Sequence, residues 1–168
     1  MSRATVTVRQ AGAQDAAAIV RIYNHYIVHT AITFDVEPVT VESRRPWFSH
    51  FHDRGPHQLW VAVQGSAVLG YADSHPFREK AAYRPTVETS VYVDREYTRQ
   101  GIGTLLYSVL FNAIVGEGVH RAIAGITLPN TASVSLHQKF GYRAVGTMSE
   151  IGFKFNRYWD VGWFERSF

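Results

Sequence analysis

A stretch near the middle of the chain combines a predicted strand, a glycine-containing turn and a predicted helix. Residues 86–94 alternate β-branched and aromatic residues, as strands do, and apolar residues recur at helical spacing over 105–117. Gly101 and Gly103 lie between them. Glycine accepts a positive φ and lets a ligand approach the backbone, and the free N–H groups of a helix's first turn attract anions, phosphate above all. A plain strand–helix loop, in which glycine is common, is the alternative for this spacing taken alone.

Two common phosphate-binding signatures do not match this turn. A Walker loop needs Lys-Ser or Lys-Thr after its second glycine, and neither pair follows Gly103. The dinucleotide fingerprint needs a third glycine, and Leu106 stands in its place. The sequence therefore excludes these two classes of phosphate site here.

Glu88 is the residue best suited to acid–base chemistry. It lies in an otherwise apolar and hydroxylic strand, Thr86-Val-Glu-Thr-Ser-Val91. A carboxylate on a central strand is costly to bury without a partner or a task. Burial would raise its pKa above the free value of about 4.3, towards that of a useful base. The alternative is a glutamate at the rim of the sheet, paired with Arg84.

A loop rich in cations immediately precedes the strand of Glu88. It carries Arg78, Lys80, Arg84 and, when protonated, His75. Arginine and lysine suit a carboxylate or another anionic group of a ligand. We therefore expect these cations to bind an anionic group of a ligand near Glu88, although a solvated loop is the alternative.

Several other chemistries find no support in the sequence. The chain has no cysteine, which excludes disulfides, a thiolate nucleophile and cysteine metal sites. Ser90 lacks the G-x-S-x-G context of a hydrolase nucleophile. The eight histidines show no H-E-x-x-H or similar spacing, so we predict no metal site.

The elements that position these residues follow the order β-α-α-β-β-β-α-β-α-β-β. The first strand holds Val6 and Val8, and a second helix starts at the N-cap Thr40 and kinks at Pro46, with Trp47, Phe48 and Phe51 on its buried face. The remaining predicted elements are the helix 13–29, the hairpin 59–63 and 67–73, the strand 86–94, the helix 105–117, the strand 122–127, the helix 131–139, and an antiparallel pair 144–148 and 158–165. Strands 86–94 and 122–127 flank a helix, which predicts a parallel pair.

The glycine turn resembles the acetyl-CoA motif of GNAT N-acetyltransferases, Q/R-x-x-G-x-G/A. Thr98 stands where the family has Gln or Arg, with Arg99 next to it. The segment 128–142 resembles the family's N-x-x-S/A helix that ends in G-F/Y, and the segment 152–160 is similar to the C-terminal signature of the phosphinothricin and methionine sulfoximine branch. Three shorter matches extend the resemblance over nearly the whole chain: Ile22-Tyr-Asn24, Val87-Glu88 and Tyr92-Val93.

The resemblance implies one mixed α/β domain over residues 1–168, in which the two central parallel strands splay apart. It also implies acetyl-CoA as the co-substrate, with the pantetheine arm in the gap between those strands. A modest net charge of +3 would help to attract this anion. The expected contacts with acetyl-CoA are Val91, Tyr92, Val93, Arg99, Gln100, Gly101, Ile102, Gly103, Thr104, Asn130 and Ser133. For Asn130 and Ser133, ordinary helix capping is the alternative.

The resemblance also assigns catalytic roles. Glu88 would be the general base, acting directly or through water. His137 would protonate the departing thiolate, which suits an imidazole pKa of about 6.5 against about 8.5 for a thiol. A histidine on the helix surface is the alternative for His137.

These features lead us to expect an N-acetyltransferase that acts on the α-amine of a small amino-acid-like substrate, by direct attack and without an acyl-enzyme. The expected substrate contacts are Phe34, His75, Pro76, Phe77, Arg78, Lys80, Tyr83, Thr86 and Val87. Two rivals remain open: an acetyltransferase for a protein N-terminus or a polyamine, and an acyl-CoA-binding sensor without catalysis.

Composition and family also bear on partners and location. No run of Lys or Arg suggests a nucleic-acid surface, and no long apolar run suggests a signal peptide or membrane span, so we expect a cytoplasmic protein. Related enzymes are homodimers, and aromatic residues gather near the C-terminus, so we expect a homodimer. The aromatic residues concerned are Phe153, Phe155, Tyr158, Trp159, Trp163 and Phe164.

Overall fold

The structure, a computed structural model, describes residues 5–168 as one mixed sheet with helices on both faces. The helices are α1 (Ala16–His29), α2 (Arg45–Phe48), α3 (Ile102–Ile114) and α4 (Thr131–Lys139). The strands are β1 (Thr7–Gln10), β2 (Gln58–Gln64), β3 (Ala67–Pro76), β4 (Thr86–Val93), β5 (Arg121–Leu128), β6 (Arg143–Lys154) and β7 (Arg157–Ser167). The predicted α/β class and element order are confirmed.

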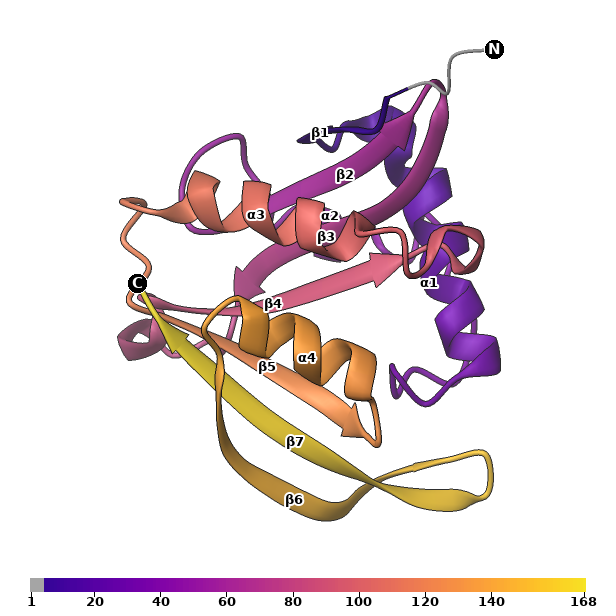
Figure 1. Ribbon diagram of the computed structural model, residues 1–168, viewed down its shortest axis with the longest axis vertical. Helices are drawn as coiled ribbons and strands as arrows, with labels where there is room; N and C mark the ends of the chain where they lie inside the picture. The colour runs from indigo at the N-terminus through magenta and orange to yellow at the C-terminus, as the bar shows by residue number, and fades with distance from the viewer. Residues whose placement is uncertain (1–4) are drawn as a thin grey trace.

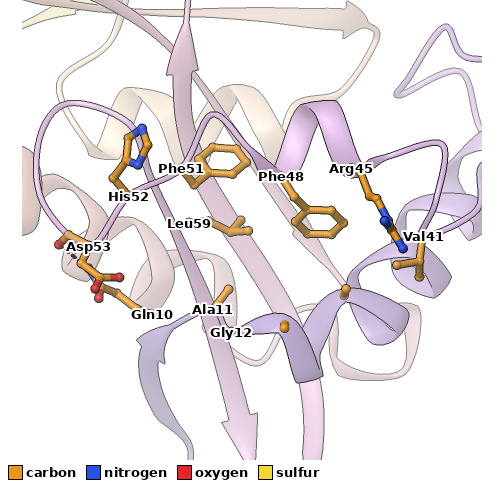
Figure 2. Close-up of a pocket in the computed structure, with 12 residues that line it drawn as sticks. Gln10, Ala11, Gly12, Val41, Arg45, Phe48, Phe51, His52, Asp53 and Leu59 are labelled. Carbon is orange, nitrogen blue, oxygen red and sulfur yellow. Dashed lines mark hydrogen bonds between the residues drawn. The ribbon is translucent and has the colours of Figure 1, made fainter.

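The sheet has the order β1-β2-β3-β4-β5-β7-β6, and only β4 and β5 run parallel among the strands described. Helix α3 provides the crossover between them, as parallel strands require. The predicted β2–β3 hairpin and the antiparallel β6–β7 pair are confirmed. In Figure 1, α3 and α4 cover the near face of the sheet and α1 lies behind it.

Each face of the sheet has its own hydrophobic core. On one face, α3 buries Leu106, Leu110 and Ile114 against β3, β4 and β5. On the other face, α1 buries Ile19 and Ile22 against β2 and β3. Strand residues alternate between the two faces, so each central strand supplies both cores.

The parallel pair separates soon after it forms. Only three residues of β4 pair with β5, and the last pair joins Glu88 to Ile123. Beyond that point β4 stays on β3 while β5 stays on β7, so the two strands diverge towards their C-terminal ends (Figure 1). The predicted splay is therefore present, and Glu88 lies where it begins.

Three predicted elements differ in extent. The helix predicted over 105–117 spans Ile102–Ile114, so it begins inside the glycine turn. The second helix is a single turn, Arg45–Phe48, preceded by hydrogen-bonded turns in which Thr40 Oγ1 accepts from Ser43 N–H, 3.1 Å away. Pro46 lies at the start of that turn, where its missing N–H costs nothing, and Phe48 is only half-buried. The final hairpin is longer than predicted, because β6 and β7 remain paired out to Lys154 and Arg157.

Candidate active site

The predicted anion cradle is formed at the N-terminus of α3. Gly101 is the N-cap, with φ 80°, and Arg99 also has a positive φ, 61°. The first backbone bond of the helix runs from Leu105 N–H to Gly101 O, 3.0 Å. The N–H groups of the first turn before Leu105 have no intrahelical acceptor and point out of the helix end.

Gly103 is a point of close approach between α3 and α4. A Cβ added there would lie 3.1 Å from Leu136 Cδ2 and 3.8 Å from the side chains of Val91 and Val93. A larger residue would therefore fill the space between the first turn of α3, α4 and the end of β4.

A cavity of about 580 Å³ occupies that space, and we call it the acetyl-CoA cavity after the ligand expected there. Nine residues expected to contact acetyl-CoA line it: Val91, Val93, Arg99, Gly101, Ile102, Gly103, Thr104, Asn130 and Ser133. Asn130 also caps α4 through its side-chain oxygen, which accepts from Ser133 N–H at 3.1 Å. The capping role and the ligand-facing position thus coexist.

The backbone of β4 is available to a ligand where the strands diverge. Asp94 N–H donates to Leu69 O, 2.8 Å, so alternate residues of β4 turn their backbone groups towards β3. Val91 and Val93 therefore turn theirs towards the gap. Tyr26 Oη–H donates to Val93 O at 2.5 Å. An extended ligand with amide groups can pair with the remaining edge of β4.

Glu88 faces a second, smaller cavity of about 270 Å³ on the other side of the gap. Its lining comprises Ile32, Phe34, Glu88, Gly125, Thr127, Ile151, Val161 and Trp163. Ile32 also lines the larger cavity, so the two adjoin. Burial raises the pKa of Glu88, while the charges of His75 and Arg78 oppose that rise. The carboxyl group is thus a stronger base than an exposed glutamate.

The loop after β3 borders a third cavity, of about 1020 Å³, next to the start of β4, and we call it the cationic cavity. Six of the expected substrate contacts line it: Pro76, Phe77, Arg78, Lys80, Tyr83 and Thr86. Arg84 adds to its positive charge, His50 and His57 also line it, and Glu79 is the one carboxylate in this lining. The Arg78 guanidinium lies 4.3 Å from the ring centre of Phe77, which steadies it in this loop.

Comparison with known proteins identifies the family. The family described as "Acetyltransferase (GNAT) domain" matches residues 8–163 of the chain. The chain belongs to the GNAT acetyltransferase family. A phosphinothricin N-acetyltransferase of Streptomyces coelicolor is 50% identical over 165 residues, covering 97% of this chain and 96% of that protein. An L-methionine sulfoximine/L-methionine sulfone acetyltransferase of Salmonella typhimurium is 35% identical, covering 93% and 91%.

Solved GNAT structures match the fold. A GNAT superfamily phosphinothricin acetyltransferase from Sinorhizobium meliloti, in complex with AcCoA, has a TM-score of 0.91 at 32% identity, covering 97% of this chain and 88% of that one. A putative acetyltransferase from Salmonella typhimurium with its cofactor acetyl-CoA has a TM-score of 0.89 at 32% identity, covering 96% and 93%. These matches show the GNAT fold and acetyl-CoA as its co-substrate.

Five residues expected at the site line none of these three cavities: Val87, Tyr92, Gln100, His75 and His137. Tyr92 packs on the opposite face of β4, stacked on Tyr71 with ring centres 5.3 Å apart, because alternate strand residues face opposite sides. Gln100 instead donates its side-chain N–H to Glu96 O, 3.3 Å away. Val87 is fully buried under α3 and cannot reach a substrate with its side chain.

His137 is buried beside Tyr107 of α3 and Tyr142, the residue before β6. Its Nδ1 lies 2.8 Å from Ser133 O, so Nδ1 carries the proton and donates it. Nε2 then accepts from Tyr107 Oη–H at 2.9 Å. Burial lowers the pKa of His137. The bond to Ser133 opposes that effect without overcoming it. Both ring nitrogens are thus engaged by protein groups, and the ring does not line the acetyl-CoA cavity.

Several site residues escaped the sequence analysis. Tyr26, Ile32, Tyr97, Ser135 and Lys139 also line the acetyl-CoA cavity. Ser135 and Lys139 share one face of α4 with Ala132 and Leu136, and this three- and four-residue spacing could have indicated them. Trp163 and Ile151 enter the Glu88 cavity from the final hairpin, and no sequence signal pointed there.

The described residues, 5–168, contain no cluster of His, Asp and Glu side chains arranged to hold a metal ion. Over the same residues, no helix combines the length and apolar character that a membrane crossing needs.

Proposed function

We propose that this chain, an acetyl-CoA-dependent N-acetyltransferase, acts on the α-amine of small amino acids of the phosphinothricin or methionine sulfoximine type. The main support for the proposal is the order of the three cavities along β4. Thr86 borders the cationic cavity, Glu88 borders the small cavity, and Val91 borders the acetyl-CoA cavity. A substrate with an anionic group at one end and an amine at the other fits this order.

Glu88 is the general base in this proposal. An amine attacks a thioester only after it has lost its ammonium proton, and a carboxylate of raised pKa removes that proton more readily than an ordinary one. The gap beside Val91 holds the acetyl donor, whose thioester the freed amine attacks directly. The first turn of α3 neutralises the phosphate charge of acetyl-CoA, and the backbone edge of β4 orients its amide groups.

Arg78 and Lys80 bind the substrate carboxylate. Both border the cationic cavity, and neither forms a salt bridge among the described residues. Their charges would repel a polyamine, which carries further ammonium groups. A sensor without catalysis would have no use for a half-buried carboxylate of raised pKa opening on the acceptor cavity.

The branch relatives carry the names of two substrates, phosphinothricin and methionine sulfoximine. Each is an α-amino acid with a tetrahedral polar group on its side chain. The small cavity combines apolar walls, Phe34, Ile151 and Trp163, with the hydroxyl of Thr127. This mixture suits a short side chain that ends in polar oxygens.

The free edge of the sheet supports a homodimer. β6 is an edge strand, exposed along most of its length, and with β7 it extends beyond the body of the protein (Figure 1). Phe153, Phe155 and Tyr158 are 56%, 52% and 59% exposed. Of the other aromatics expected in an interface, Phe164 is buried in the core and Trp163 borders the Glu88 cavity. A second copy of the chain would cover the exposed three.

A pair of matched substrates tests the proposed function. Thiol release from acetyl-CoA is measured with methionine sulfoximine and with the amine that remains after its carboxyl group is removed. The proposal predicts a kcat/KM at least roughly tenfold higher for the amino acid, since a charged hydrogen bond is worth about 1.5–3 kcal/mol. Equal rates would favour a polyamine or protein N-terminus as the substrate.

A further inference from the structure

We propose that the proton taken from the substrate comes to rest on His75, which Asp73 and Glu88 hold between them, and leaves through the cationic cavity. The inference rests on the proposed role of Glu88 as the base. It assigns to this chain a three-group proton acceptor, Asp73–His75–Glu88, in place of a lone carboxylate.

Strand geometry brings the three groups together. His75 on β3 and Glu88 on β4 are directly opposite each other in the antiparallel register. Asp73 lies two residues before His75, on the same face of β3. His75 Nε2 is 4.0 Å from Glu88 Oε2, a separation that one bridging water or a small rotation of either side chain closes.

Asp73 determines how the imidazole is oriented. Its Oδ1 lies 2.6 Å from His75 Nδ1, and its side chain is only 2% exposed. A buried carboxylate acting on Nδ1 keeps the proton of neutral His75 on that nitrogen. The lone pair of Nε2 is then free on the side of Glu88. This arrangement is costly to build unless the imidazole gains a second proton during the reaction.

The electrostatic surroundings favour that second proton. Burial alone would lower the pKa of His75, but the hydrogen bond and charge of Asp73, with the charge of Glu88, raise it overall. The charge of Arg44, from the turn before α2, acts in the opposite direction. His57, before β2, also faces His75, whose charge lowers the pKa of His57. The net effect raises the pKa of His75 above that of a free imidazole.

The proton moves in two transfers, from the substrate to Glu88 and then to His75. Glu88 accepts one proton from the substrate ammonium and becomes a neutral carboxylic acid. It passes that proton to Nε2 of neutral His75, which becomes an imidazolium paired with Asp73, and Glu88 is again a carboxylate. His75 is next to Pro76 in sequence, and its charge lowers the pKa of His57. Pro76 and His57 both border the cationic cavity. Release of the proton to water there restores the starting state.

The position of the acid limb of the pH profile tests this array. A neutral His75 is needed to accept the proton, so activity appears above the raised pKa of His75. Asp73→Asn removes the cause of that rise, so the acid limb of kcat/KM moves to lower pH. His75→Gln removes the limb of His75 altogether and lowers kcat/KM roughly tenfold at the optimum, a modest share of a general-base effect. His75→Ala recovers part of its rate when imidazole is added.

Controls separate this inference from the proposed function. His29→Gln changes an exposed histidine of α1 and should leave the profile unchanged. Acetyl-CoA affinity and thermal unfolding are measured for every variant. An Asp73→Asn acid limb at the wild-type pH, or a His75→Gln variant with wild-type kcat/KM, would overturn the array even if Glu88→Gln is inactive. An active Glu88→Gln variant would instead overturn the base itself.

Discussion

The ring of Phe34 lies directly on the backbone of Gly152. A Cβ on Gly152 would be 2.2 Å from two atoms of that ring. Nearby, Lys154 Nζ donates to Thr33 O at 2.8 Å, which ties the loop after α1 to the final hairpin. Phe34 and Ile151 belong to these two segments, and both wall the small cavity beside Glu88. The contact therefore sets the shape of the acceptor site.

We expect Gly152→Ala to raise KM for the amino acid several-fold, because the added methyl group pushes Phe34 into or out of the small cavity. Acetyl-CoA affinity should not change, since neither residue lines its cavity. Gly146→Ala is the matched control on the same strand, where a Cβ meets open space. An unchanged KM for Gly152→Ala would show that the Phe34 contact has no part in acceptor binding.

Gly103→Val should weaken acetyl-CoA binding roughly tenfold or more, a loss of about 1.4 kcal/mol. The larger side chain fills the space between α3 and Leu136 and blocks the approach of the ligand to the backbone. Calorimetric titration with acetyl-CoA measures the effect, with a thermal melt to verify folding. Gly146→Val serves as control. A folded Gly103→Val variant of wild-type affinity would place the acetyl donor elsewhere.

Arg78→Ala and Lys80→Ala should each raise KM for methionine sulfoximine by roughly tenfold, the value of one charge-assisted hydrogen bond. The same variants should act on the decarboxylated amine as the wild type does, because no carboxylate is left to bind. Arg54→Ala, an exposed cation outside the cationic cavity, is the control. A KM that rises equally for both substrates would mean that the loop acts through its fold rather than through charge.

His137→Phe should destabilise the protein by about 1–3 kcal/mol, because Tyr107 Oη and Ser133 O lose their partner in a buried site. The ring is neutral and engaged at both nitrogens, so kcat should fall less than about tenfold, well short of a general-acid effect. Denaturant unfolding and steady-state kinetics measure the two quantities. A hundredfold loss of kcat without loss of stability would restore the role of proton donor that the family resemblance implies.

The fold and the acetyl-CoA cradle could be predicted from the sequence because both depend on local patterns of residues. The cradle is local: Gly101, Gly103 and the first turn of α3 are close in sequence, so spacing alone reveals them. Element order followed from periodicity, which failed only at α2, where Pro46 and turn hydrogen bonds shorten the helix.

The acceptor site is less accessible to such reasoning because distant segments form it. Gly152 contacts Phe34 and Trp163 lies beside Glu88 only after β6 and β7 have joined the sheet. Two residues of β4 expected at the site are also absent from it, since Val87 is buried under α3 and Tyr92 lies on the face of β4 opposite Val91 and Val93. Asp73 is buried in contact with His75 and belongs to no sequence motif, so the sequence did not indicate it.

The central claim is that Glu88 removes the proton from the amine that this enzyme acetylates. Its most direct test compares Glu88→Gln with the wild type in acetyl-CoA-dependent acetylation of methionine sulfoximine, with thiol release and the N-acetyl product both measured. The account predicts a kcat lower by roughly 10²–10⁴, with unchanged acetyl-CoA affinity. A folded Glu88→Gln variant with near wild-type kcat would contradict it.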